Sequence, residues 1–559
     1  MNQFRNENRI WNGWGRVDFQ LYDENIKKEL KNFLSVYLEK PIYKPKDIQK
    51  QEIVQKIPES PIQFNEEFSQ IKNFVFLDKE IRLLYSFGQS FPDWISFKTG
   101  WNLQITDAVA IPNSIDQLKL VYEFCKKNQY KILIYGGGTS VVGHIRPEIH
   151  PVITISMEKF NRVKEISKEN NYAIVEAGAN GPEIEEQLQR YGYRLGHFPQ
   201  SFEYSTLGGW IATRSSGQQS LYYGRIEDLF LGGKVLTNKG ELEIAPIPAS
   251  SAGLDIKAWI LGSEGRTSII YEAMVKVRKL PELEEFYGAF FKNETSAINF
   301  IKQAVQLKTS LSMIRFSFPE ETNINLEMAK TTGHKKTIDY LNQYLSFKGF
   351  KQNFGMMILG FTGTKKEVQS SKKLIFNLIK NFNGLVPHSF VSKKLGKSWE
   401  KNRFFSPYLR NTLWEFGYGV DTLETCLPWD KILTGKENIE NAIRTAAETF
   451  KEKVIVYTHL SHVYLNGSSI YTTYIFRLKE NPQELFEFWK EMKHNASKAI
   501  TELGGTISHQ HGVGKDHKEY LIVEKGTIGM DWIKNYVKSA DPNQIFDNNN
   551  LIDVQKDLL

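Results

Sequence analysis

The stretch Ile134–His144 reads Ile-Tyr-Gly-Gly-Gly-Thr-Ser-Val-Val-Gly-His. It follows the apolar residues Ile132 and Leu133, which predict a β-strand that ends at the three glycines. Because glycine has no Cβ and tolerates positive φ, the backbone here can approach a ligand closely. Successive N–H groups can then face one concavity and bind a pyrophosphate, and Thr139 and Ser140 add hydroxyl donors. A short glycine motif of this kind is equally typical of an ordinary turn.

Two downstream segments favour a ligand-binding loop. Residues 196–228 read GHFPQSFEYSTLGGWIATRSSGQQSLYYGRIED, and residues 262–265 read Gly-Ser-Glu-Gly. With the glycine loop, these segments resemble the FAD-binding domain (PCMH type) of the vanillyl-alcohol-oxidase superfamily, over roughly residues 100–280. This loop is not the G-x-G-x-x-G fingerprint of NAD enzymes.

The resemblance implies FAD as the cofactor. We expect the FAD to be non-covalent, because no histidine occupies the usual attachment place in the glycine loop. The residues assigned to the cofactor in this way are Gly136, Gly137, Gly138, Thr139, Ser140, His197, Pro199, Ser201, Ser205, Thr206, Gly208, Gly209, Thr213, Gly262, Ser263, Glu264 and Gly265.

Length and composition limit the classes of protein. The 559 residues are enough for two or three domains, and 41% hydrophobic with 24% charged residues is ordinary for a globular protein. Only Cys125 and Cys426 are present, which argues against a disulfide scaffold and excludes a cysteine-rich metal site. The net charge of +7 is compatible with an anionic substrate or an anionic membrane surface. It is too weak to indicate nucleic-acid binding, and no nucleic-acid motif accompanies it.

The sequence has no apolar run of membrane-spanning length and no apolar signal-peptide core near its start. We therefore predict a cytoplasmic protein in peripheral contact with a membrane, and a homodimer.

Apolar runs alternate with helical stretches along most of the chain, which predicts an α+β fold. We expect a two-subdomain FAD-binding domain over residues 99–281 and an α/β substrate-binding cap over residues 282–500. Residues 1–98 are predicted to be an accessory helical segment, and residues 501–559 a segment that completes the active site. The strongest local predictions are helices at 24–40, 115–128 and 367–381, and strands at 151–156, 172–177, 230–236, 310–318 and 355–361.

Two motifs in the second half carry groups that can move protons. They are the stretch from Thr458 to Tyr471, which includes His459 and His462, and Gly504–Lys515, which includes His509 and His511. Histidine is the side chain best suited to proton transfer near neutral pH. Tyrosine can take part when nearby cations lower its pKa. The spacing of His459 and His462 also suggests metal binding, but we predict no metal; His509 and His511 would share one face if their segment were a strand.

The whole chain resembles the alkylglycerone-phosphate synthase (alkyl-dihydroxyacetone-phosphate synthase) family, the flavoenzymes of ether-lipid synthesis. The resemblance begins at Arg9-Ile-Trp-Asn-Gly-Trp-Gly and runs to the tail at Asp541, through Tyr408-Leu-Arg410 and Glu424–Asp430. It implies that the acyl group of acyl-dihydroxyacetone phosphate is exchanged for a long-chain alcohol without net oxidation. In this family flavin N5 holds the dihydroxyacetone phosphate as a covalent adduct during the exchange.

By resemblance, Tyr471 is the candidate acid/base, assisted by His509 and His511. Arg315 and Arg410 would hold the phosphate or the leaving carboxylate, because the planar guanidinium suits both anions. Apolar residues of the cap would line a tunnel for the chains. Each of these residues also has an ordinary alternative, as a packed tyrosine, a solvated arginine or a histidine in a structural hydrogen-bond network.

The sequence departs from the family pattern at four positions. Gln510 interrupts a run of three histidines, His144 replaces a glycine, and Asp547 stands where glycine is usual. Arg266 follows Gly-Ser-Glu-Gly, where it could alter the electrostatics around the flavin or point to solvent.

Two other functions stay open. One is an FAD-dependent 2-hydroxy-acid dehydrogenase or oxidase, although the segments that supply metal ligands in those enzymes read Leu465–Tyr471 and Gln510-His511 here. The other is a non-catalytic flavin-binding scaffold, which the density of histidine and arginine disfavours.

Overall fold

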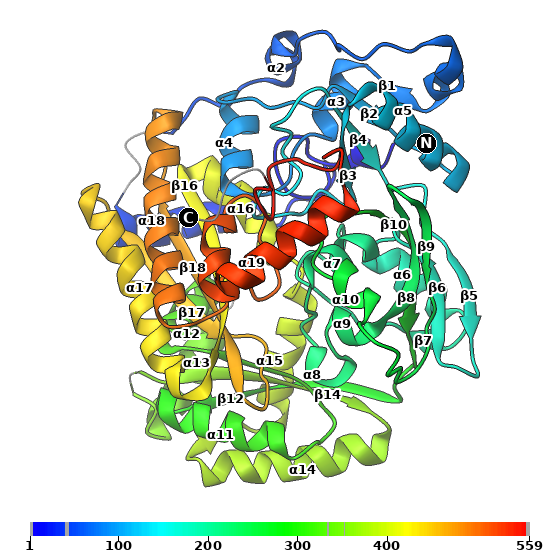
Figure 1. The fold of residues 1–559 in the computed structure, drawn as a ribbon. Coiled ribbons are helices and arrows are strands. Elements are labelled where there is room, and N and C mark those ends of the chain that lie inside the picture. Colours follow the sequence, from blue (N-terminus) through cyan, green and yellow to red (C-terminus); the bar gives the residue numbers. More distant parts are fainter. Residues whose placement is uncertain (1–3, 40–43, 332–334, 352, 555–559) are drawn as a thin grey trace.

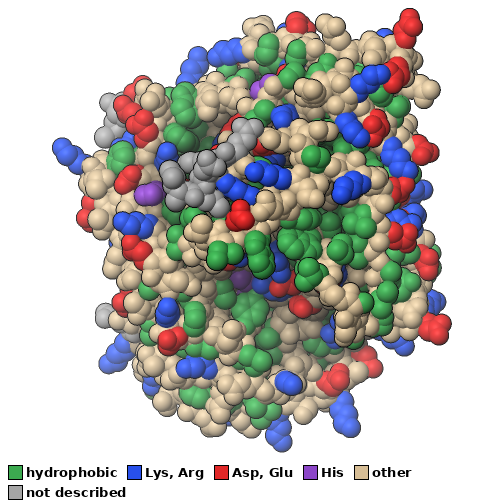
Figure 2. All heavy atoms as spheres, viewed as in Figure 1, with side chains coloured by type: hydrophobic (Ala, Val, Ile, Leu, Met, Phe, Trp, Pro, Cys, Tyr) green, Lys and Arg blue, Asp and Glu red, His purple; other side chains and the backbone are tan. Residues whose placement is uncertain are grey.

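A computed structural model describes residues 4–39, 44–331, 335–351 and 353–554. The FAD-binding half and the cap lie side by side and the chain passes between them more than once (Figure 1). The fold is α+β, as predicted. On the face drawn in Figure 2, basic and acidic side chains are interspersed and hydrophobic side chains gather near the middle. Among the described residues, no helix is both long and apolar enough to cross a membrane.

The first subdomain of the FAD-binding half is built on a four-stranded sheet in the order β1-β2-β4-β3. β2, β4 and β3 run parallel, and β1 joins the edge in the antiparallel direction. The Ser114 hydroxyl accepts the N–H of Gln117 and so begins the predicted helix α5 (Ile115–Asn128). The strands are β1 (Val75–Phe76), β2 (Ala108–Ala110), β3 (Lys131–Tyr135) and β4 (Val152–Ser156).

The second subdomain is an antiparallel five-stranded sheet in the order β5-β6-β10-β8-β9. Helix α7 (Leu207–Thr213) packs against β10, and its N-terminus faces the end of β3 across the glycine loop. The strands are β5 (Val163–Ser167), β6 (Tyr172–Glu176), β8 (Phe230–Thr237), β9 (Gly240–Ile244) and β10 (Ile269–Lys276). The flanking helices are α6 (Gly181–Gln189), α8 (Ser220–Tyr223), α9 (Ile226–Leu229) and α10 (Ile256–Ile260), and a small ladder joins β7 (Tyr193–Arg194) to β11 (Arg278–Lys279).

The cap is a seven-stranded antiparallel sheet in the order β15-β12-β14-β13-β17-β18-β16. Helices α17 and α18 pack on each other and cover one face of the sheet (Figure 1). The strands are β12 (Leu283–Phe291), β13 (Leu311–Ser317), β14 (Gly355–Gly363), β15 (Gly384–Leu385), β16 (Tyr418–Pro428), β17 (Val454–Leu460) and β18 (Gly467–Arg477). The helices are α11 (Glu294–Gln306), α12 (Pro319–Ala329), α13 (Lys335–Phe347), α14 (Lys365–Asn381), α15 (Ser389–Asn402), α16 (Leu409–Phe416), α17 (Ile432–Thr449) and α18 (Pro482–Glu502).

Both ends of the chain pack against the FAD-binding half. Near the N-terminus, Arg9 donates a hydrogen bond to the Gly137 carbonyl at 2.5 Å. Near the C-terminus, the Ile132 amide of β3 donates to the Ile545 carbonyl at 2.7 Å. Of the segment before residue 99, β1 belongs to the first sheet and α4 (Phe91–Thr99) packs against α18. The remaining helices at the two ends are α1 (Glu24–Leu38), α2 (Lys50–Lys56), α3 (Lys79–Leu84) and α19 (Leu521–Ala540).

Candidate active site

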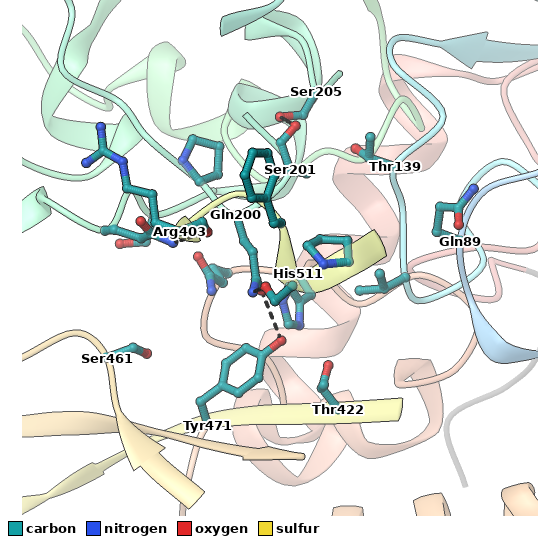
Figure 3. Close-up of a pocket in the computed structure, with 18 of the residues that line it drawn as sticks. Gln89, Thr139, Gln200, Ser201, Ser205, Arg403, Thr422, Ser461, Tyr471 and His511 are labelled. Carbon is teal, nitrogen blue, oxygen red and sulfur yellow. Dashed lines mark hydrogen bonds between the residues drawn. The ribbon is translucent and has the colours of Figure 1, made fainter. Parts of the chain in front are cut away.

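One cavity of about 1300 Å³ runs from the glycine loop into the cap. Its lining residues come from both halves of the molecule, so neither half encloses it alone. Figure 3 shows Thr139, Ser201 and Ser205 on one side and Tyr471, Thr422 and Ser461 on the other.

The glycine loop can exist only with glycine at its centre. A Cβ on Gly137 would lie 1.9 Å from the carbonyl oxygen of Tyr204, and one on Gly136 would lie 2.4 Å from the Thr206 hydroxyl oxygen. Gly138 has φ +67° and its Cβ would meet Tyr135. The loop therefore places bare backbone next to the N-terminus of α7, where N–H groups and the helix dipole favour a bound anion. α7 itself is too short to make such a site alone.

Hydroxyl groups complete this wall. Thr206 accepts the Gly209 N–H and begins α7. Ser268 lines the cavity, and its buried Oγ has no hydrogen-bond partner among the described residues. An unpaired buried hydroxyl beside a glycine cradle fits a polar ligand such as the pyrophosphate or the ring system of FAD.

Most of the residues predicted to bind the cofactor line this cavity. They are Gly136, Gly137, Gly138, Thr139, Ser140, Pro199, Ser201, Ser205, Thr206, Gly208, Gly209, Thr213, Glu264 and Gly265. The structure does not bring the other three to the cavity wall. His197 lies one layer behind it, where Nε2 is 3.2 Å from the hydroxyl of Ser215, itself a lining residue. Gly262 and Ser263 form the turn that leads to Glu264.

Tyr471 lies on the opposite wall. Its hydroxyl donates to the Gln200 side-chain carbonyl at 3.5 Å (Figure 3), and its ring stacks on His459 at 4.8 Å. The ring of His511 stands edge-on to Tyr471, with 6.0 Å between the centroids. Tyr471 and His511 therefore face the same part of the cavity.

Burial determines the direction of both pKa shifts in this pair. Burial raises the pKa of Tyr471 above its ordinary value, and nearby Arg410 only partly opposes this shift. Burial also lowers the pKa of His511, although Glu424 opposes that shift. The pair is therefore a protonated phenol beside a neutral imidazole, which is one proton donor and one proton acceptor.

The two predicted arginines both line the cavity, in different surroundings. Arg315 is paired with Glu321 at 2.6 Å and lies 3.1 Å from His459 Nδ1. Burial works against ionisation of Glu321, but Arg315 and His459 outweigh it and lower its pKa to about 2. Arg410 donates to the Gln89 carbonyl, and its buried Nη2 has no hydrogen-bond partner among the described residues. Arg410 is therefore the better placed of the two to bind an added anion.

His509 is not at the cavity wall. Its segment is not a strand, so His509 and His511 do not share a strand face. The His509 ring is buried between Tyr464, whose hydroxyl is 2.6 Å from Nε2, and the Glu424 carboxylate, 3.2 Å from Nδ1. Glu424, His462 and His509 have potential ligand atoms within 4.8 Å of one another, so this group has the composition of a metal site. His459 belongs to the Arg315 pair instead.

Two of the departures from the family pattern pair with each other. Arg266 is 1% exposed and lies 2.8 Å from the Asp547 carboxylate, so the expectation that it could point to solvent is wrong. His144 lies 2.7 Å from the Ser140 hydroxyl and 3.0 Å from the Glu264 carboxylate. Gln510 lines the cavity and donates its amide to Glu424.

Several site residues were missed by sequence reasoning. Gln200 lies between Pro199 and Ser201, and its position inside that motif was a usable signal. Arg403 lines the cavity and donates to Gln219 at 3.0 Å. Glu321 lies six residues after Arg315, its partner, and this spacing was a usable signal. Glu424 stood within a quoted family stretch, but its partners His509 and Gln510 lie far away in the sequence, so its contacts gave no local signal.

The cap part of the cavity carries many apolar side chains. They come from α12, α13, β14 and α15 and include Leu326, Ile338, Leu341, Tyr344, Met356, Val391 and Leu395, beside the polar Asn325, Lys394 and Lys397 of α12 and α15. A channel of this composition suits aliphatic chains better than small polar acids.

Comparisons with known proteins define first the class and then the family. Residues 106–245 match a family model described as an FAD binding domain, and residues 280–551 match the C-terminal domain of FAD linked oxidases. The chain is therefore an FAD-binding enzyme.

Among curated proteins, the chain is 32% identical over 520 residues to the alkyldihydroxyacetonephosphate synthase of Dictyostelium discoideum, covering 89% of this chain and 82% of that one. It is 27% identical over 565 residues to the alkyldihydroxyacetonephosphate synthase of Trypanosoma brucei brucei, covering 96% and 91%. A solved structure of an alkyldihydroxyacetonephosphate synthase superposes with a TM-score of 0.81 at 27% identity, over 97% of this chain and 98% of the other. The chain belongs to the alkyldihydroxyacetonephosphate synthase family.

Proposed function

We propose that this enzyme exchanges the acyl group of acyl-dihydroxyacetone phosphate for a long-chain alcohol. The alcohol oxygen forms the new ether bond to the dihydroxyacetone carbon, and the original carbon–oxygen bond breaks to release a fatty acid. The observation that carries the proposal is the continuity of one cavity, from the glycine loop past Tyr471 to the apolar side chains of the cap part. The names of the relatives support the same reaction.

The residues of the chain supply the binding and the proton transfers. The glycine loop and its hydroxyls hold FAD, which when bound supplies the nucleophilic centre of the exchange. Tyr471, as a protonated phenol, donates a proton to a substrate oxygen, and His511, as a neutral imidazole, accepts one. Arg410 has a free donor for the phosphate or the leaving carboxylate, while Arg315 is already neutralised by Glu321.

The oxidising alternative has less support from the site. A 2-hydroxy acid is small and polar, whereas apolar side chains from four secondary-structure elements line the cap part of the cavity. The arrangement of Tyr471 with His511 provides a proton donor and acceptor, as an exchange without net oxidation requires.

The experiment that tests the proposal is an exchange assay with isotope-labelled fatty alcohol. Purified holoenzyme is expected to incorporate the label into an ether product and to release one fatty acid for each ether formed. Flavin bleaching by 2-hydroxy acids without any labelled ether would contradict the proposal and favour the dehydrogenase.

The cytoplasmic location, the peripheral membrane contact, the homodimer and the non-covalent mode of FAD binding are parts of the same proposal. Substrates with long aliphatic chains partition into lipid surfaces, which supports peripheral contact with a membrane. Flotation with vesicles tests the membrane contact, light scattering tests the homodimer, release of FAD on denaturation tests the non-covalent binding, and cell fractionation tests the location.

A further inference from the structure

Glu424 is a buried carboxylate directly behind the Tyr471 wall. It lies on β16 opposite Tyr471 of β18, so the two side chains leave the sheet on the same face. Only 2% of Glu424 is exposed. Burial opposes its ionisation, but His509 and His462 outweigh burial and hold the pKa of Glu424 below its ordinary value. Glu424 is therefore a buried anion beside the candidate proton donor.

Most of its contacts go to the segment that carries the histidines. The Gln510 amide donates to Oε2 at 2.5 Å, and His509 Nδ1 lies 3.2 Å from Oε1. The backbone N–H of His509 donates to the Glu424 carbonyl at 3.2 Å. Ser461 donates to Oε1 at 3.0 Å from the loop after β17. Glu424 thus connects the His509 backbone and the side chains of His509 and Gln510 to the cap sheet.

His511 follows this anchored pair and has no regular secondary structure to hold it. Its ring nevertheless stands edge-on to Tyr471 in the cavity. We propose that Glu424 is a positioning residue, which fixes the 509–510 segment so that His511 faces Tyr471 during the exchange. The expected effect on kcat rests on the proposed function. The anchoring of the 509–510 segment by Glu424 does not depend on that function.

The same cluster has the composition of a metal site, and the hydrogen bonds of Glu424 favour the anchor instead. Both oxygens of Glu424 already accept hydrogen bonds from protein side chains, Ser461 and Gln510. Tyr464 and Ser216 contact the ring nitrogens of His509 and His462 that point away from Glu424, and these contacts are compatible with either role.

The test compares Glu424→Gln with Glu440→Gln, which removes a second buried carboxylate. Glu440 is 3% exposed, accepts the Thr458 hydroxyl at 2.8 Å and is not among the lining residues of the cavity. Hydrogen–deuterium exchange of peptides covering residues 505–516 and the kcat of the exchange reaction are measured for both variants. FAD content, KM and Tm are measured alongside.

Glu424→Gln is expected to increase deuterium uptake at 508–513 and to lower kcat by about 100-fold, with KM changed less than about threefold and FAD retained. Glu440→Gln is expected to lower Tm while uptake at 508–513 and kcat stay near wild type. If Glu424→Gln does not fold, Gln510→Ala removes one anchor and is expected to lower kcat by about tenfold.

Unchanged uptake and unchanged kcat in Glu424→Gln would overturn the proposal. So would one equivalent of bound transition metal in the wild-type holoenzyme that is lost in Glu424→Gln, because Glu424 would then be a ligand. If the wild-type protein shows no exchange, the proposed function fails, and deuterium uptake alone still decides whether Glu424 anchors the segment.

Discussion

The cavity wall that we propose for FAD consists mainly of backbone, glycine and hydroxyls, with the ionisable pair His144 and Glu264 beside it, whereas the wall around Tyr471 carries many ionisable side chains. The first is assembled within the loop after β3 and the start of α7. The second joins β13, β16, β18 and the 508–511 segment through pairs such as Arg315–Glu321 and Glu424–His509. A large cofactor can approach the backbone closely only where side chains are absent. Proton transfer instead requires ionisable side chains that are held in fixed pairs.

The largest expected effect is on the backbone wall. Gly137→Val would drive a branched side chain into the Tyr204 carbonyl, because even a Cβ there would lie 1.9 Å from that oxygen. The loop must then move, and we expect FAD affinity to fall by at least about 100-fold, since overpacking costs about 1–3 kcal/mol before any cofactor contact is lost. Equilibrium dialysis with FAD measures this. Gly529→Ala in α19, with 3.5 Å to its nearest neighbour, is the control and should bind FAD normally.

On the ionisable wall, Tyr471→Phe should remove the proton donor and leave the shape. We expect kcat for exchange to fall about 100- to 1000-fold, with FAD stoichiometry unchanged. Tyr457→Phe, on the neighbouring strand and also in the cavity lining, is the matched control. If Tyr471→Phe were as active as the control, Tyr471 would have no role in the mechanism. The proposal that the ionisable wall carries out the proton transfer would then be contradicted.

These two predictions also concern features that differ in how far they could be predicted from the sequence. The helix start at Ser114 is a local signal, since its cap partner Gln117 lies three residues away. The loop at Gly136 is predicted from its glycine run alone, although the groups that exclude a Cβ there, Tyr204 and Thr206, belong to a separate segment. Contacts such as Glu424 with Gln510 join residues 86 positions apart, and no periodicity records them. The sequence therefore predicts Tyr471 and His511 by resemblance, and it does not predict the residues that contact and orient them.

In a buried contact of its own, the Arg266–Asp547 pair tests whether two departures from the family pattern compensate each other. Asp547→Gly leaves a buried guanidinium without its carboxylate, which we expect to lower the free energy of unfolding by about 2–3 kcal/mol. The double variant Arg266→Thr/Asp547→Gly should recover most of this loss. Chemical denaturation of the single and double variants measures the coupling, and additive effects would show that the two positions are independent.

The smallest effect concerns pH and the FAD-binding half. Burial raises the pKa of Glu185 to about 7, above its ordinary value of 4.5. The unfolded chain ionises first, so this group makes folding less favourable as pH rises from about 4.5 to 7, and the loss is complete above 7. Glu185→Gln should therefore be more stable than wild type at pH 8, by on the order of 1 kcal/mol, and equal to it near pH 4. Denaturation curves at the two pH values check the sign; equal stability of the variant and the wild type at both pH values would mean that burial does not raise the pKa of Glu185.

The contacts of the last residues with the cofactor loop set an order of events during synthesis. Asn548 donates to the His144 carbonyl and Asn550 to the Glu264 carbonyl, each from more than 280 residues downstream. A nascent chain exposes its glycine loop long before the ribosome has made these two asparagines. Flavin loading is therefore expected to require that residues 548–550 have been made and have folded back onto the loop, so a yellow holoprotein would mark molecules that contain this segment.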